Sequence, residues 1–245
     1  MFSPHPQAQT VSAYCVDLLL KAAVEAGAPE NLLACTAGMK DLTNHVLGHK
    51  DIHFILATGG PSVVNLSYHS GKPAIGVGAG NCPALVDETA DLKEAISGII
   101  ISKTFDNGMI CASENSTVLV DEIYDKAIET FQRRGAYLCT PEEKEKLGET
   151  LVQNGHLNPR IVGQSAIEIA HMAGFSVPDN TVALLGEATE IGPNEPMSYE
   201  KLCPVLGVYR AKDFTDGVRV AKELATFGGV GTSFLSFYTG YSYIF

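Results

Sequence analysis

The sequence predicts an α/β protein built around largely parallel β-sheets. Short apolar and β-branched runs alternate with amphipathic stretches of helical length, the pattern typical of β-α-β units. Some of these short runs lead directly into glycine-rich turns, as strands do where they connect to helices. The chain has 245 residues, of which 45% are hydrophobic, so it can bury a sizeable core. This length fits one large domain or two small ones.

The first part of the chain contains apolar residues at helical spacing and two short buried strands. The first helix is expected to end at a glycine, which is a common residue at helix C-termini. We predict helices over Val11–Gly27, Met39–Gly48 and Ser62–Ser70, and strands over Phe54–Ala57 and Pro73–Val77.

The second part continues the same alternation up to a last amphipathic helix. Helices are predicted over Asp91–Ser102, Glu122–Arg134, Pro141–Asn154, Gln164–Ala173 and Phe214–Phe227, and strands over Thr117–Val120, Val182–Leu185 and Val205–Arg210. Residues 232–245 (TSFLSFYTGYSYIF) differ sharply, because they are rich in aromatic residues and carry no charge. Such a segment is unlike a solvated C-terminus.

The charge balance excludes several classes of partner. Lys and Arg number 17 against 28 Asp and Glu, for a net charge of −11. A nucleic-acid partner is not expected, because a protein that binds the phosphate backbone usually presents a basic face. No run approaches the roughly 20 apolar residues of a membrane-spanning helix, and the N-terminus lacks the pattern of a signal peptide. The six cysteines form no CxxC motif. We therefore expect a cytoplasmic protein with reduced thiols.

Two glycine-rich segments are candidates for ligand binding. ATGGPSVV (Ala57–Val64) places a glycine turn between a strand and a helix N-terminus, where exposed N–H groups can bind an anion. In GVGAGNCPALVDETADL (Gly76–Leu92), three glycines close together leave room for a flat ligand. Either segment could instead serve turn geometry alone.

A third segment, SKTFDNGMICASEN (Ser102–Asn115), contains a candidate nucleophile. Cys111 is surrounded by small residues, so its thiol could be exposed in a cleft and activated by nearby backbone N–H groups. A single cysteine is more often a small buried apolar residue, and spacing alone does not decide between the two.

Metal binding and carboxylate catalysis are weaker alternatives. His45, His49 and His53 recur every four residues, but no acidic or cysteine partner completes a metal site, and we predict none. The charged run Asp87–Glu88 with Asp91 is expected to be a solvated turn and a helix N-cap.

Taken together, these segments resemble the aldehyde dehydrogenase superfamily, and more narrowly the CoA-acylating half of the bifunctional aldehyde–alcohol dehydrogenases. The resemblance extends from Phe2 to Gly231 and includes FSPHP, LATGGPSVV, GKPAIGVGAGN, SKTFDNGMICASE, GFSVP and EKLCPVL. It implies an aldehyde-dehydrogenase-like α/β fold. Residues 1–80 would be the C-terminal part of a Rossmann-like NAD-binding domain, residues 81–231 the catalytic cysteine domain, and residues 232–245 an aberrant aromatic tail.

The resemblance implies a reaction at Cys111. In the family a cysteine thiolate attacks the aldehyde, hydride passes to NAD, and a thioester remains. Members that release a free acid use a glutamate to activate water, and the alignment places Val77 at that position. Valine cannot take a proton, which favours attack on the thioester by the thiol of CoA. Acetaldehyde and acetyl-CoA are the expected substrate and product.

The cofactor contacts are also implied by the resemblance. Glu200 occupies the position of a glutamate that binds the nicotinamide ribose hydroxyls, which suits a carboxylate because it accepts from both. The other implied contacts are Gly59, Gly60 and Ser62 to the pyrophosphate, Gly76 and Gly78 beside the nicotinamide, and His5 near the adenine ribose. The full-length protein is expected to form a homo-oligomer.

Two features of the sequence keep an alternative open. The family domain is longer than this chain, and its oxyanion asparagine lies in a segment that precedes FSPHP. At the other end the family reads GGxGHTS, whereas here Gly231 is followed directly by Thr232 and the histidine is missing. The alternative is therefore a truncated, catalytically inactive fragment that acts at most as a binding or assembly module.

Overall fold

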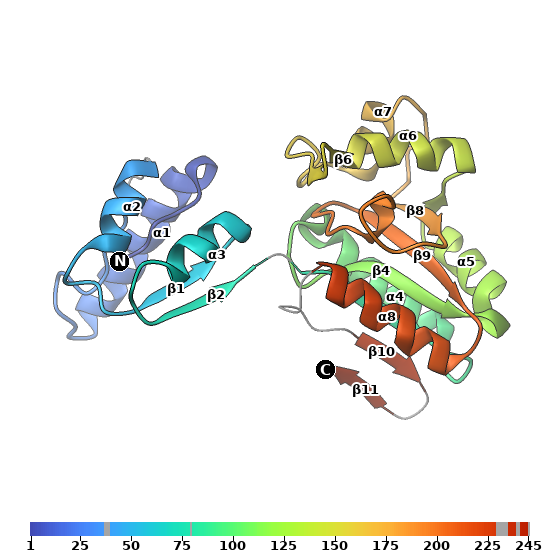
Figure 1. Ribbon diagram of the computed structural model, residues 1–245, viewed down its shortest axis with the longest axis horizontal. Helices are drawn as coiled ribbons and strands as arrows, with labels where there is room; N and C mark the ends of the chain where they lie inside the picture. Colours follow the sequence, from blue (N-terminus) through green and yellow to red (C-terminus); the bar gives the residue numbers. More distant parts are fainter. Residues whose placement is uncertain (37–39, 79, 229–234, 239–240, 245) are drawn as a thin grey trace. The chain divides into compact units, whose positions relative to one another are not determined.

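The computed structural model describes residues 1–36, 40–78, 80–228, 235–238 and 241–244 (Figure 1). The described chain forms two compact units, Met1–Val77 and Gly78–Phe245. Strands and helices alternate in both, so the predicted α/β class is confirmed. No helix among the described residues is long and apolar enough to cross a membrane.

The first unit contains one parallel β-α-β motif and two further helices. The strands β1 (Ile55–Thr58) and β2 (Ala74–Val77) pair in parallel and are connected by α3 (Pro61–Tyr68). The short helix η1 (Pro6–Ala8) precedes α1 (Gln9–Glu25), and α2 is Lys40–Gly48.

One face of this small sheet is covered by the rest of the first unit, and the other face is exposed to solvent. Ile55 and Ala57 are buried, whereas Leu56 is 71% and Ile75 is 53% exposed. Because successive side chains of a strand point to opposite faces, one whole face of the β1–β2 pair contacts solvent.

The second unit is organised around a seven-stranded sheet in the order β11-β10-β3-β4-β9-β8-β5. All neighbours pair in parallel except β10 and β11, which are antiparallel. The strands are β3 (Cys82–Val86), β4 (Glu114–Val120), β5 (Ala136–Leu138), β8 (Ala183–Ala188), β9 (Val205–Ala211), β10 (Leu235–Tyr238) and β11 (Tyr241–Ile244).

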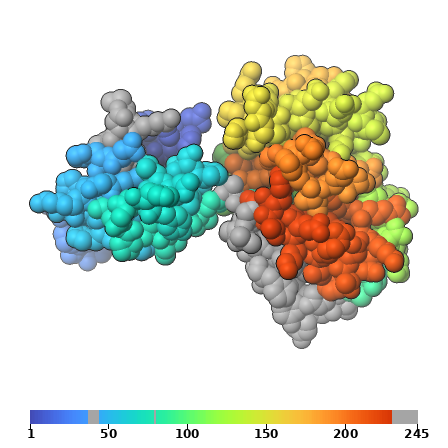
Figure 2. All heavy atoms as spheres, in the orientation of Figure 1, coloured from blue at the N-terminus to red at the C-terminus, as the bar shows by residue number. Residues whose placement is uncertain are grey.

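Helices cover both faces of this sheet, as parallel sheets require. One core layer packs α4 (Leu92–Thr104) and α5 (Tyr124–Arg133) against alternate strand residues. The other layer includes α8 (Phe214–Gly228), which lies across the front of the sheet in Figure 1 and forms part of the outer surface in Figure 2. The helices α6 (Pro141–Leu151) and α7 (Ala166–Met172) complete this layer.

The helix N-termini are capped by the expected residue types. Asp91 Oδ1 accepts from the N–H groups of Lys93 and Glu94, which confirms its prediction as the N-cap of α4. Thr140 and Glu143 form a reciprocal capping box at the start of α6.

Six of the described strands were not predicted, and one helix was predicted too long. The segment Cys82–Val86, which lies inside the second glycine-rich candidate segment, forms the fully buried strand β3. The helix predicted to continue to Asn154 ends at Leu151. Asn154 and Gly155 both have positive φ, 53° and 75°, and connect a short hairpin of β6 (Val152–Gln153) and β7 (His156–Leu157). An Asn-Gly dipeptide is a strong hairpin signal, and here it overrides the helical pattern.

The segment 232–245 contains the last two strands. β10 extends the sheet beside β3 in parallel register, with Leu235 opposite Ala84, and β11 returns antiparallel to it. The predicted roles of residues 1–80, 81–231 and 232–245 stay predictions.

Helix α4 offers a direct test of this layered packing, because two isoleucines in it have opposite environments. Ile99 is fully buried and Ile101 is 68% exposed. We expect Ile99→Ala to lower the free energy of unfolding by about 2–5 kcal/mol through lost burial and a residual cavity. The matched control Ile101→Ala should change it by less than about 0.5 kcal/mol. Urea unfolding followed by circular dichroism measures both, and equal losses would contradict the placement of α4.

Candidate functional site

Cys111 lies in an exposed turn between two elements of the second unit. The turn follows α4 and the short helix η2 (Phe105–Gly108) and leads into β4. Cys111 is exposed, whereas Cys82, Cys139 and Cys203 are buried. The prediction of an accessible thiol therefore agrees with the structure, although Cys15 on α1 is exposed as well.

The turn that carries Cys111 has an unusual backbone. Asp106, Asn107 and Gly108 have φ values of 49°, 51° and 71°, three successive residues in the left-handed region. This region is unfavourable for residues with a Cβ, so surrounding contacts must hold it in place. Asn107 Nδ2 donates to the carbonyl of Gly163 at 2.9 Å, and the N–H of Gly163 donates to the carbonyl of Leu202 at 3.1 Å.

Gly108 is required by a close backbone contact as well as by its φ. A Cβ built there would lie 2.7 Å from the carbonyl carbon and oxygen of Cys203. The Cys111 turn therefore packs directly on the segment that includes Glu200 and Cys203. This contact brings two of the predicted site segments together within the second unit.

Glu200 lies just after the short helix η4 (Pro196–Ser198) and before β9. It is half-buried, and burial raises the pKa of its carboxyl group, while a hydrogen bond from the N–H of Gly80 opposes that shift. A carboxylate has about four acceptor positions, so one such bond leaves capacity for further donors.

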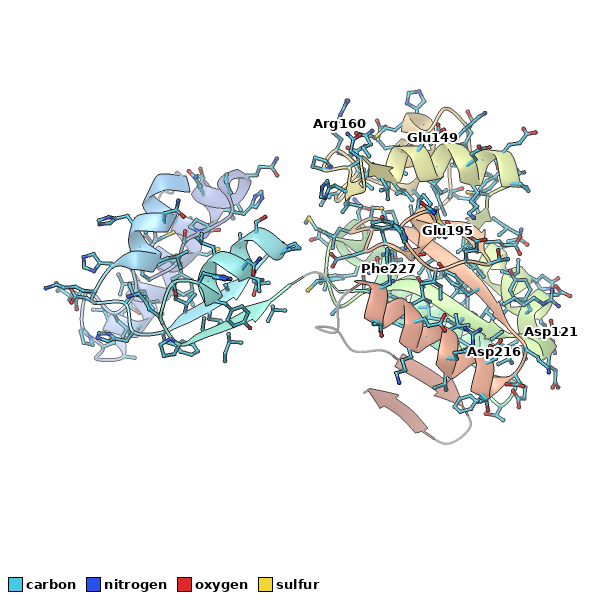
Figure 3. All side chains as sticks on the ribbon, in the orientation of Figure 1. Asp121, Glu149, Arg160, Glu195, Asp216 and Phe227 are labelled. Carbon is cyan, nitrogen blue, oxygen red and sulfur yellow. The ribbon has the colours of Figure 1, made fainter. Side chains whose placement is uncertain are left out.

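The segment before Glu200 is anchored to α6. Glu195, labelled in Figure 3, is buried, and its Oε2 accepts from Lys144 Nζ at 2.6 Å. Its Oε1 caps η4 by accepting from the N–H of Met197 at 3.0 Å. A partly buried ion pair therefore fixes the segment that leads to Glu200.

Two buried lysines lie beside Glu200 and the Cys111 turn, and the sequence analysis identified neither. Lys103 and Lys201 are both fully buried. Burial lowers the pKa of Lys103 to about 8 and that of Lys201 to about 7. Lys103 Nζ donates to Asn115 Oδ1 at 3.0 Å, and Lys201 Nζ donates to the carbonyls of Met197 and Tyr199, both at 2.8 Å.

Other titratable groups around Lys103 also have altered pKa values. Burial raises the pKa of the Cys203 thiol to about 11 and that of Cys82 to about 12. Burial also raises the pKa of Glu114, against the lowering effect of Lys103. These three groups are buried, so each favours its neutral form relative to water.

The predicted phosphate-binding residues lie together at one turn of the first unit. Gly59 and Gly60 connect β1 to α3, which starts with Pro61, and Ser62 is exposed in its first turn. A Cβ at Gly60 would meet no atom within 4 Å, and α3 has no side-chain N-cap. The free N–H groups of a helix start can bind an anion at such a place.

Gly76 and His5 have local structural contacts beside their predicted cofactor roles. A Cβ at Gly76 would lie 2.7 Å from Val64 Cγ1, and its N–H donates to Tyr68 Oη at 3.0 Å. Close packing of β2 under α3 therefore already requires glycine there. His5 is exposed and caps η1, because its Nδ1 accepts from the N–H of Gln7. Gly78, the first residue of the second unit, is half-buried.

The histidine series does not gather into a ligand set among the described side chains. The rings of His45 and His49 lie 5.7 Å apart, and His49 Nδ1 lies 3.8 Å from Asp51 Oδ2. Within the part of the chain that the structure describes, no three His, Cys, Asp or Glu residues are placed to hold a metal.

Comparisons with known proteins agree on one class, the oxidoreductases that act on aldehydes. The model of the aldehyde dehydrogenase family matches residues 5–153, and the chain therefore belongs to this family. The bifunctional aldehyde-alcohol dehydrogenase AdhE of Escherichia coli is 50% identical over 232 residues, which are 94% of this chain and 26% of that protein. The aldehyde-alcohol dehydrogenase of Clostridium acetobutylicum is 48% identical over 231 residues, which are 94% of this chain and 27% of that protein.

Solved structures show the same likeness. An acetylating aldehyde dehydrogenase from Geobacillus thermoglucosidasius has a TM-score of 0.94 and 40% identity, over 97% of this chain and 53% of that one. A propionaldehyde dehydrogenase from Rhodopseudomonas palustris, with bound CoA and an acylated cysteine, has a TM-score of 0.83 and 32% identity, over 91% and 51%. An engineered glycolyl-CoA reductase with bound NADP+ has a TM-score of 0.88 and 30% identity, over 98% and 54%. The chain thus spans about a quarter of its bifunctional relatives and about half of these structures.

The Gly108 contact can be tested against a glycine with similar φ and open surroundings. Gly155 has φ of 75° and no atom within 4 Å of a built Cβ. Gly155→Ala should therefore lower the free energy of unfolding only by the cost of a Cβ in the left-handed region, about 1–2 kcal/mol. Gly108→Ala should lose about 1–3 kcal/mol more, because its Cβ overlaps the Cys203 backbone. Chemical unfolding of the two variants gives the difference, and equal losses would show that the close contact is absent.

Proposed function

We propose that this chain carries the reacting cysteine and part of the cofactor site of an NAD-dependent, CoA-acylating aldehyde dehydrogenase. The observation that carries the proposal is the exposed thiol of Cys111 on a turn that packs against the Glu200 segment. The acylated cysteine and CoA of the Rhodopseudomonas palustris relative support the same chemistry. Acetaldehyde and acetyl-CoA are the proposed substrate and product, in line with the acetylating relative from Geobacillus thermoglucosidasius.

In the proposed reaction the Cys111 sulfur, as thiolate, forms a bond to the aldehyde carbon, and the carbonyl oxygen takes the negative charge. When the oxygen lone pair reforms the carbonyl, hydride leaves that carbon with its electron pair, and a thioester on Cys111 remains. Bound NAD supplies the two-electron acceptor for this hydride. The thiol of CoA, after losing its proton, attacks the thioester carbon and releases Cys111 as thiolate.

The residues present fit a dinucleotide. The Glu200 carboxylate is half-buried, accepts from Gly80, and retains positions for two ribose hydroxyls. Gly59, Gly60 and Ser62 provide an open glycine turn at a helix start for the pyrophosphate. Gly76 and Gly78 are proposed beside the nicotinamide and His5 beside the adenine ribose. The NADP+ of the engineered reductase supports a nicotinamide cofactor, and the choice of NAD is part of our proposal.

We also propose domain roles, a cellular location and an assembly state. We propose residues 1–80 as part of the cofactor domain and residues 81–231 as the catalytic domain, with 232–245 a divergent tail. The full-length protein is proposed to act in the cytoplasm as a homo-oligomer.

A non-catalytic binding or assembly module is a second candidate, favoured by one observation. In the first unit Phe54, Leu56 and Ile75 are 55%, 71% and 53% exposed, an apolar set that favours association with other protein surface. Under this reading the Cys111 turn would have no chemical role, and its thiol would react no faster than any other exposed thiol.

Selective alkylation tests the role of Cys111. We expect limited iodoacetamide to label Cys111 several-fold faster than the other five cysteines, because its side chain is exposed and a thiol held as a nucleophile reacts faster than one that is only accessible. Peptide mapping gives the rates, with exposed Cys15 as the internal reference and Cys111→Ser as the control for site assignment. If Cys15 reacts as fast as Cys111, the second candidate is favoured.

The valine at position 77 predicts which nucleophile, water or CoA, attacks the thioester. In a full-length protein that carries this sequence, NADH formation from acetaldehyde should depend on CoA. Water needs a general base, whose help is typically worth about 10²–10⁴-fold, and valine provides none. A thiol is already partly ionised near pH 7 and is intrinsically more nucleophilic.

Val77→Glu should therefore raise acetate formation relative to acetyl-CoA, with Val77→Gln as the control of similar size without a base. NADH production with and without CoA, combined with product analysis, is the measurement. Equal rates with and without CoA in the unmodified protein, with acetate as product, would overturn the acylating assignment.

A further inference from the structure

Asn115 lies where three segments of the second unit meet. It is the second residue of β4 and is 1% exposed. Its Oδ1 accepts from Lys103 Nζ at 3.0 Å and from the backbone N–H of Lys201 at 3.1 Å, so both lone pairs of this oxygen are used. Its Nδ2 lies 3.5 Å from the carbonyl oxygen of Ser113, in the turn that carries Cys111.

These contacts close the Cys111 turn at its base. Lys103 lies in the last turn of α4, before the Cys111 turn, and Asn115 lies directly after it. The hydrogen bond between Lys103 and Asn115 therefore joins the two ends of the segment 104–114. Both side chains are buried, so water does not compete for this bond.

The same oxygen ties the turn to Glu200. Lys201 follows Glu200 in the chain, and its N–H donates to Asn115. The turn contacts this segment a second time where Gly108 packs on the backbone of Cys203. Cys111 thus lies between two attachments, at Gly108 and Asn115, both made to the segment 200–203.

We propose that Asn115, together with Lys103, is a positioning residue that fixes the Cys111 thiol relative to Glu200 and hence to the bound cofactor. This inference rests on the proposed function, because it assigns Cys111 as the nucleophile and Glu200 as the ribose ligand. Hydride transfer needs the reacting atoms in near-contact, and a displacement of about 1 Å can cost about 10²-fold in rate. A single buried oxygen shared by both segments limits such a displacement.

The chemistry of the buried residues supports a positioning role over simple packing. A fully buried ammonium group carries a large desolvation penalty, and an apolar side chain of similar volume would fill the same space without it. Lys103 gives a directional, charge-assisted donor that an apolar residue cannot give. Lys201 Nζ in turn bonds the carbonyls of Met197 and Tyr199, so the segment around Glu200 is held from both sides.

The test uses the full chain and measures amide hydrogen exchange in the segments 105–113 and 199–203 by mass spectrometry. Asn115→Leu should accelerate exchange in both segments by roughly tenfold or more, because two charge-assisted or buried bonds are lost together. Asn115→Asp keeps an oxygen acceptor for Lys103 and for the N–H of Lys201, and should stay within about threefold of the unmodified chain. Lys103→Met should accelerate 105–113 and leave 199–203 unchanged, because the bond from Lys201 to Asn115 remains.

Thr117→Val is the matched control. Thr117 is a buried residue of the same strand, and its Oγ1 has no hydrogen-bond partner among the described residues, so the isosteric change removes no bond. It should accelerate neither segment. The proposal is overturned if Asn115→Leu moves only one segment or neither, if Thr117→Val moves both equally, or if Asn115→Asp fails to restore slow exchange. If Asn115→Leu does not fold, the other two variants decide. Lys103→Met should then accelerate exchange in 105–113 and not in 199–203, and Asn115→Asp should stay within about threefold of the unmodified chain. Any other result overturns the proposal.

Iodoacetamide labelling separates this proposal from the proposed function. The ratio of Cys111 to Cys15 labelling should fall toward one in Asn115→Leu and recover in Asn115→Asp. A ratio near one in the unmodified chain contradicts the nucleophile assignment, whereas the exchange data judge the positioning role independently. Coupled loosening of both segments with a normal labelling ratio in every variant would overturn the link to the thiol.

Discussion

The close approach of Gly108 to the backbone of Cys203 is the constraint on which the site depends. It requires a residue without Cβ, three successive left-handed residues, and a partner segment that cannot move away. That partner is fixed in turn by the ion pair of Glu195 with Lys144 and by the bond from Gly80 to Glu200. The position of the exposed thiol therefore depends on this backbone contact together with the buried hydrogen bonds of Asn115.

Parallel topology explains why distant parts of the sequence meet at this place. Cys82 starts β3, Glu114 starts β4, and Cys203 lies two residues before the start of β9. Because β3, β4 and β9 are adjacent and parallel, their amino ends lie at one edge of the sheet. Open α/β sheets usually bind ligands at the carboxyl edge, and in the first unit the Gly59–Gly60 turn does follow the carboxyl end of β1. The cysteine segment uses the opposite edge of its own sheet.

The sequence was sufficient for the fold class, most elements and the candidate cysteine, because these depend on local periodicity and on a long motif. It was insufficient for Lys103, Asn115 and Lys201, although one signal was present. Ile96, Ile99 and Lys103 follow helical spacing on one face of α4, so Lys103 falls on the buried face. A lysine in that position is normally read as the polar end of a helix. Only the tertiary partner Asn115, at the far end of the cysteine turn, shows why it is buried.

Several features of the second unit that lower its stability lie near the amino ends of β3, β4 and β9. The buried lysines Lys103 and Lys201 and the left-handed residues Asp106 and Asn107 lie there. So do buried oxygens without partners among the described residues, on Asn81, Glu114 and Ser116. An unsatisfied buried polar atom typically costs about 1–3 kcal/mol, and a stable core would be expected to avoid several together. The large apolar layers on both faces of the sheet offset these costs. A concentration of strain and buried charge at one place is what a preorganised site requires, because flexible residues could not hold a nucleophile against a cofactor ligand.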